Sequence, residues 1–100
     1  MKLATTISDF YRYGITPAEA VRLYEGTSFR YLDYNFYKEI YPGSPFLTDD
    51  WMARVRDAAK AAEQLGYTFI QAHSPGYDNL DMSKDQHIAV MAAKRSIEAC

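Results

Sequence analysis

The chain has 100 residues, enough for one compact domain and too few for two, so we treat residues 1–100 as a single domain. Its net charge of −2 gives no reason to expect a nucleic-acid partner, because DNA and RNA binders usually carry a basic face. A single cysteine, no signal-like N-terminus and no long apolar run predict a cytoplasmic protein that does not enter a membrane.

The first expected strand covers residues 2–8, which are β-branched and partly apolar. A helix is predicted over 17–25. Its start is marked by a capping box, in which the Thr16 hydroxyl accepts from the Glu19 amide and the Glu19 carboxylate reaches back. Gly26 is expected to end this helix.

The second expected strand covers residues 31–36, where apolar and polar residues alternate. An excursion loop is predicted over 37–47, and a helix capped by Thr48 to Asp50 follows over 49–65. The apolar face of this helix is made by Trp51, Val55, Ala58, Ala62 and Leu65. Its lysines and arginines are expected to form a solvated face.

The third expected strand covers residues 67–73 and leads into a turn-rich loop over 74–79. A second capping box, Ser83 to Gln86, predicts a helix over 84–99. The resulting order of three strands, each followed by a helix, predicts an α/β fold with a parallel sheet and right-handed crossovers.

The connections of this α/β pattern differ at the two ends of the strands. Those that follow the strands are long and rich in polar or aromatic side chains, whereas those that follow the first two helices are short and marked by glycine. This asymmetry favours a partial (β/α)8 TIM barrel, consisting of the first three βα units and truncated at the C-terminus. A doubly wound sheet is less favoured, because no glycine-rich phosphate loop follows the first strand.

Three stretches resemble the N-terminal part of the xylose-isomerase-like TIM barrels, the sugar phosphate isomerase/epimerase family. They are the strand that begins Tyr31-Leu32-Asp33 after a glycine-stopped helix, the strand entry Leu65-Gly66-Tyr67, and the strand ending His73-Ser74-Pro75 with its later Asn79-Leu80. The resemblance implies a parent that interconverts sugars or sugar phosphates by metal-assisted proton transfer through an enediol-like state.

The same resemblance bears on cofactors and activity. It implies a divalent metal (Mn, Mg, Co or Zn) in the full-length parent, held mostly by residues of later strands. We therefore expect this chain alone to bind no metal tightly and to be inactive as an isomerase. Whether the chain counts as an enzyme by itself is left open.

Four residues are candidates for substrate binding. Asp33 and Asn35 lie two apart on a strand, so they share a face, and His73 ends the next strand. Phe10 follows the first strand and could stack on a sugar ring. The alternatives are local pairing of Asp33, a His73 that only bonds a loop, and a Phe10 packed under its own loop. The resemblance also suggests His73 as a metal ligand.

Two other functions remain open for the chain. One is a noncatalytic truncated barrel module, and the other is a fragment of an apurinic-endonuclease-like phosphodiesterase, which the acidic charge balance disfavours. The expected partner is a small-molecule sugar or sugar phosphate. Because a partial barrel leaves two sheet edges open, we also expect self-association through these edges.

Overall fold

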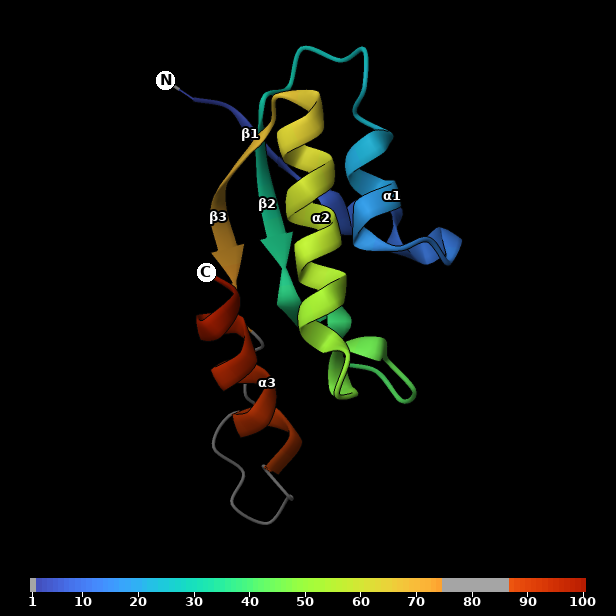
Figure 1. The fold of residues 1–100 in the computed structure, drawn as a ribbon, viewed down its shortest axis with the longest axis vertical. Helices are drawn as coiled ribbons and strands as arrows, with labels where there is room; N and C mark the ends of the chain where they lie inside the picture. Colours follow the sequence, from blue (N-terminus) through green and yellow to red (C-terminus); the bar gives the residue numbers. More distant parts are fainter. Residues whose placement is uncertain (1, 75–86) are drawn as a thin grey trace.

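The computed structural model describes residues 2–74 and 87–100 of the chain. Its helices and strands are, in chain order, β1 (Ala4–Thr6), α1 (Pro17–Arg22), β2 (Tyr31–Asn35), α2 (Trp51–Leu65), β3 (Thr68–His73) and α3 (His87–Ala99). The strands form one parallel sheet in the order β1-β2-β3 (Figure 1). The α/β class and the parallel pairing predicted from the sequence are therefore confirmed.

Two predicted features of the chain fall outside the described residues. These are most of the turn-rich loop that follows β3 and the capping box expected before α3. Within the described ranges, no helix combines the length and the apolar character that crossing a membrane requires.

The capping box predicted at the start of α1 is confirmed, but the helix ends at Arg22 with Leu23 as its C-cap, so the prediction that it runs to residue 25 and is ended by Gly26 is wrong. The predicted ends of α2 are partly wrong. The Thr16 hydroxyl accepts from the Glu19 amide at 3.2 Å, and the Thr16 amide donates to the Glu19 carboxylate at 2.7 Å. At the start of α2, Asp50 makes no side-chain capping bond, and Thr48 donates to the Pro45 carbonyl instead. Gly66 ends α2 with a φ of 73°, a left-handed conformation that glycine adopts without steric cost.

The segments that follow β1 and β2 are more ordered than the loops expected from the sequence. The aromatic residues after β1 form a 3₁₀ helix, η1 (Ile7–Tyr13), and the excursion after β2 holds η2 (Phe36–Glu39) and η3 (Pro45–Leu47). All three lie at the carboxyl end of the sheet. This end of the molecule therefore consists of short 3₁₀ helices where the sequence predicted irregular loops.

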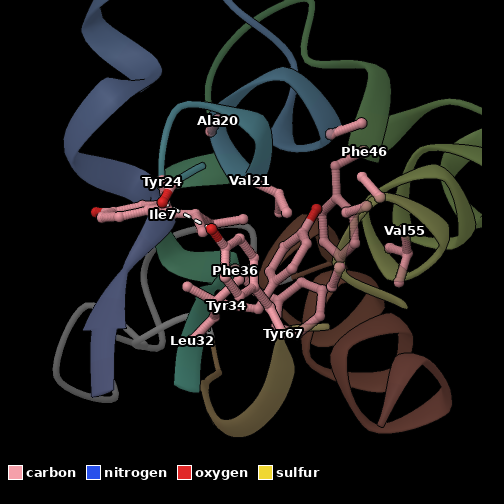
Figure 2. Close-up of a cluster of buried hydrophobic side chains, with 14 of the residues drawn as sticks. Ile7, Ala20, Val21, Tyr24, Leu32, Tyr34, Phe36, Phe46, Val55 and Tyr67 are labelled. Atoms are coloured by element: carbon pink, nitrogen blue, oxygen red, sulfur yellow. Dashed lines mark hydrogen bonds between the residues drawn. The ribbon is translucent and has the colours of Figure 1, made fainter. Parts of the chain in front are cut away.

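Helices α1 and α2 pack against each other on one side of the sheet (Figure 1). The core lies between them and β2, where Leu32 and Tyr34 point toward the helices together with Phe36 (Figure 2). The Tyr67 hydroxyl donates to the Tyr24 carbonyl at 2.7 Å and joins the entry of β3 to the end of α1. This packing determines which face of β2 is left for polar side chains.

Helix α3 lies beyond the carboxyl end of β3 and runs antiparallel to it, with its last residues beside the end of that strand (Figure 1). Arg95 donates to the carbonyls of Phe46 at 2.6 Å and Thr48 at 2.8 Å. The hydroxyl of Ser96 lies 3.2 Å from that of Ser74. Polar contacts thus hold α3 against η3 and against the residue that follows β3.

Candidate functional site

A row of polar side chains occupies the face of the sheet that points away from α1 and α2. Leu32 and Tyr34 face the helices, so the alternation of β2 turns Asp33 to the opposite face. In the strand register Asp33 stands beside Thr6 of β1 and Gln71 of β3. Neighbouring partners in a sheet share a face, so these polar groups come together near the carboxyl end.

Asp33 and His73 form a direct pair at this end of the sheet. The Nδ1 atom of His73 lies 2.9 Å from Oδ1 of Asp33. Only 8% of the Asp33 side chain is exposed, compared with 54% of that of His73. An ionised carboxylate only accepts hydrogen bonds, so a bond to it places a proton on Nδ1, and in the neutral imidazole the Nε2 lone pair of His73 is then left for other chemistry. Two of the candidates that the sequence places on neighbouring strands therefore meet at the carboxyl end of the sheet.

Gln71 is the nearest neighbour of the exposed end of the imidazole. Its Nε2 atom lies 3.3 Å from Nε2 of His73, so the amide can donate to the lone pair that Asp33 leaves unprotonated. His73 is thereby held at both ring nitrogens. Gln71 was not among the residues that the sequence singled out, because its position depends on the register of β3.

A β-bulge at Ile70 decides which face His73 occupies. Phe69 pairs with Leu32 and Gln71 with Asp33, so Ile70 is an extra residue between them. Strict alternation from the buried Tyr67 and the half-buried Phe69 would turn His73 toward the helices. The bulge reverses this alternation and directs Gln71 and His73 to the face of Asp33.

The other two predicted site residues have local partners. Asn35 is the register partner of His73 and shares its face, but its Oδ1 accepts from the Tyr37 amide at 3.1 Å and caps η2. Phe10 packs edge-on against the Tyr24 ring, with 5.2 Å between ring centroids. The structure therefore brings together Asp33 and His73, places Asn35 beside them, and holds Phe10 against Tyr24, which follows α1. Their roles in substrate binding stay predictions.

A second polar cluster, missed by the sequence analysis, lies on the helix side of β2. Glu39 is fully buried, and its carboxylate accepts from Arg54 Nε and from the Tyr34 hydroxyl, both at 3.1 Å. The prediction that the cations of α2 are all solvated is wrong for Arg54, whose side chain is only 14% exposed. A fully buried carboxylate requires a cation, and Arg54 is the one that α2 directs toward η2.

The Glu39 cluster also affects the tyrosines around it. Burial raises the pKa of Tyr34 far above its usual range, and the negative charge of Glu39 adds to this effect. The pKa of Tyr11 is raised in the same direction, mainly by burial and further by Tyr34 and Glu39. Both phenols therefore stay protonated, which suits a structural role for the cluster.

The fit of the site to a divalent metal can be judged from its donors. Among the residues that the structure describes, no three His, Cys, Asp or Glu side chains come close enough to hold a metal ion. In the polar row, His73 Nδ1 is bonded to Asp33 and Nε2 is contacted by Gln71. These described residues therefore do not form a metal site by themselves.

Comparisons with protein-family models, curated proteins and solved structures find no match to this chain.

Proposed function

We propose that the chain provides the first three βα units of a (β/α)8 barrel that isomerises or epimerises a sugar or sugar phosphate. In this proposal His73 transfers a proton of the substrate, and Asp33 orients and polarises the His73 imidazole. The observation that carries the proposal is the 2.9 Å pair between their side chains. It lies at the carboxyl end of a parallel sheet and away from the helices, where barrels of this class build their active sites.

The chemistry follows from the proton on Nδ1. With Nδ1–H donated to Asp33, the Nε2 lone pair of His73 can accept a proton from the carbon next to a carbonyl group. The electrons of the broken C–H bond then form a carbon–carbon double bond, and the carbonyl oxygen takes up the negative charge of an enediolate. For isomerisation, the hydroxyl proton of the enediolate moves from its oxygen to the former carbonyl oxygen, and His73 returns its proton to the former carbonyl carbon. Return of the proton to the other face of the original carbon, with the carbonyl group restored, epimerises the sugar.

The neighbours of the pair suit a substrate that carries hydroxyl groups. Thr6 is hydrogen-bonded to Ser8 at 3.0 Å and stands beside Asp33 in the register, while Gln71 offers an amide on the other side. Hydroxyls and amides both donate and accept, which matches the mixed character of a polyol. We propose that these groups position the substrate and that Gln71 turns away from Nε2 when it binds.

Ligand titration followed by NMR tests this proposal. Imidazole ¹⁵N shifts of His73 are recorded while unphosphorylated and phosphorylated aldoses and ketoses are added up to millimolar concentrations. We expect a saturable shift of the His73 signals with at least one sugar and a loss of this response in Asp33→Asn. The matched control is Asp9→Asn, because Asp9 is an exposed acid at the same end of the sheet.

The control experiment also defines the opposing outcome. If no sugar shifts the His73 signals, or if Asp9→Asn weakens the response as strongly as Asp33→Asn, the polar row does not bind the substrate. A response to inorganic phosphate that equals the response to every sugar phosphate would likewise contradict a site for the sugar itself.

A further inference from the structure

Helix α3 and the sheet leave two apolar surfaces facing solvent. One is the α2–β3 groove, which we define by Val55 and Ala59 of α2 and Phe69 and Ile70 of β3. It encloses a cavity of about 370 Å³, and its side chains are mostly apolar. Tyr34 and Phe36 of the core and Ala99 and Cys100 at the end of α3 also line this groove, so only the last residues of α3 reach it.

The second apolar surface belongs to α3 itself. The residues that α3 buries are Ala92 and Ser96, while Val90 and Ile97 are 43% and 75% exposed. Val90, Ala93 and Ile97 follow the spacing i, i+3 and i+7, so they line one face of the helix. This face points away from the contacts that hold α3 now, which are the polar bonds of Arg95 and Ser96, the stacking of Arg95 over the Trp51 ring and the burial of Ala92 in the core.

The geometry relates these two surfaces to each other. Helix α3 already runs antiparallel to β3, as a crossover helix does when it lies on the sheet, and Ala99 and Cys100 line the end of the groove (Figure 1). Thirteen helical residues measure about 20 Å, and the six residues of β3 measure about the same. A slide of α3 along its own axis, with a rotation, is sufficient to seat it beside β3.

We propose that α3 has a second docking position, in which Val90, Ala93 and Ile97 occupy the α2–β3 groove. In this position the helix covers the edge of the core, and Arg95 leaves the carbonyls of Phe46 and Thr48. The contact between Ser74 and Ser96 also breaks. Because Ser74 directly follows His73, the position of α3 sets the surroundings of the Asp33–His73 pair, whatever ligand this pair binds.

A spin label on Cys100, the single cysteine of the chain, distinguishes the two positions. Cys100 lines the same cavity as Gln71 and Ala72, so the observed position broadens the amide signals of these two residues. In the second position the label moves toward the amino end of β3. The broadening then shifts to Leu65 and Thr68.

Two variants drive the equilibrium in opposite directions. Arg95→Ala removes the anchor of the observed position, and we expect it to reduce broadening at Ala72 at least twofold and to increase it at Thr68. Ile97→Lys places a charge on the face that enters the groove, and we expect broadening to remain at Ala72 only. Lys94→Ala is the matched control, because Lys94 is an exposed neighbour of Arg95 on the same helix.

Three outcomes overturn the proposal. The first is an Arg95→Ala chain whose broadening pattern equals that of Lys94→Ala. The second is loss of broadening at both ends of β3, which means that the released helix docks nowhere. The third is a mixing experiment, in which a ¹⁵N-labelled chain without a spin label is combined with copies that carry the spin label but no ¹⁵N. Broadening at Thr68 in this mixture assigns the groove to a second molecule. The sugar titration described above is independent of all three.

Discussion

The two buried carboxylates on opposite sides of β2 differ in their partners and in the roles that these partners suit. Asp33 and Glu39 are both almost completely buried, but Asp33 pairs with a half-exposed histidine, whereas Glu39 is enclosed by Arg54 and Tyr34. A histidine changes its charge near neutral pH, and an arginine does not. The comparison teaches that the partner, more than the burial of the acid, separates a pair suited to proton transfer from one that holds the fold together.

Breaking the Glu39 cluster should have the largest effect. Glu39→Ala leaves Arg54 largely buried without its carboxylate, so we expect the free energy of unfolding to fall by about 3 kcal/mol. Urea denaturation followed by circular dichroism measures this loss. Glu63→Ala, which removes an exposed acid from α2, should change stability by less than about 0.5 kcal/mol. Equal losses in the two variants would contradict a structural role for Glu39.

Alkaline pH should weaken the same cluster by a somewhat smaller amount. The pKa values of Tyr11 and Tyr34 are raised in the folded chain above the ordinary value of 10.0. Their contribution to stability is therefore complete below pH 10 and is lost as the pH rises above it, because the unfolded chain releases these protons first. From pH 10 to 11 we expect the two phenols together to cost about 2 kcal/mol.

A variant separates this alkaline effect from that of the other ionisable groups. The double variant Tyr11→Phe/Tyr34→Phe keeps both rings but removes both titrating hydroxyls. Its stability should fall less steeply between pH 10 and 11 than that of the natural chain, as measured by urea denaturation at each pH. Parallel slopes would show that the two phenols ionise as readily in the folded chain as in the unfolded one.

Breaking the Asp33–His73 pair should scarcely affect stability. His73 is half-exposed and solvent screens its interaction, so we expect Asp33→Asn to cost less than about 1 kcal/mol. The same variant should abolish the preference of His73 for the Nδ1–H tautomer, which imidazole ¹⁵N shifts report. A loss of stability as large as that of Glu39→Ala, or an unchanged His73 tautomer, would contradict the different roles assigned to the two carboxylates.

Removing the bulge should have the smallest effect of these changes, because it should leave the hydrogen bond between Asp33 and His73 intact. Deletion of Ile70 leaves Phe69 beside Leu32 and Gln71 beside Asp33, so the faces of Gln71 and His73 are unchanged. We expect the tautomer of His73 to be preserved in this variant. Insertion of an alanine after Gln71 leaves the bulge and the Gln71–Asp33 partners in place but adds one residue before His73, so His73 turns toward the helices and the Nδ1–H signature should disappear. The same signature in both variants would show that the alternation of β3 does not control the orientation of His73.

The element order, the parallel sheet and the capping box of α1 follow from local signals that the sequence carries. The alternation of β2 likewise predicts the opposite faces of Asp33 and Tyr34. The orientation of His73 is different, because alternation alone within β3 would turn it into the core. The bulge is a feature of the pairing between β2 and β3, where Phe69 packs against Tyr34, and spacing along the chain does not reveal such contacts between strands.

The Glu39 cluster escaped prediction for a related reason. Glu39 and Arg54 are 15 residues apart and belong to different elements, so no helix or strand period relates them. In the sequence Glu39 stands in a segment with two prolines and a glycine, which reads as exposed loop. Its burial accompanies contacts with Arg54 of α2 and Tyr34 of β2, which join only in the folded chain.

The hydrogen bond from Tyr67 to the Tyr24 carbonyl has a consequence for the order in which the chain assembles. The two residues are 43 positions apart, and beside this bond the Thr68 amide donates to the Arg30 carbonyl at 2.9 Å. When the chain emerges from the ribosome, the unit formed by β1, α1 and β2 therefore lacks its closing contacts until residue 68 is available. Its nascent form exposes Tyr24 and the inner side of β2 during this interval, which is when an aggregation-prone chain most needs a chaperone.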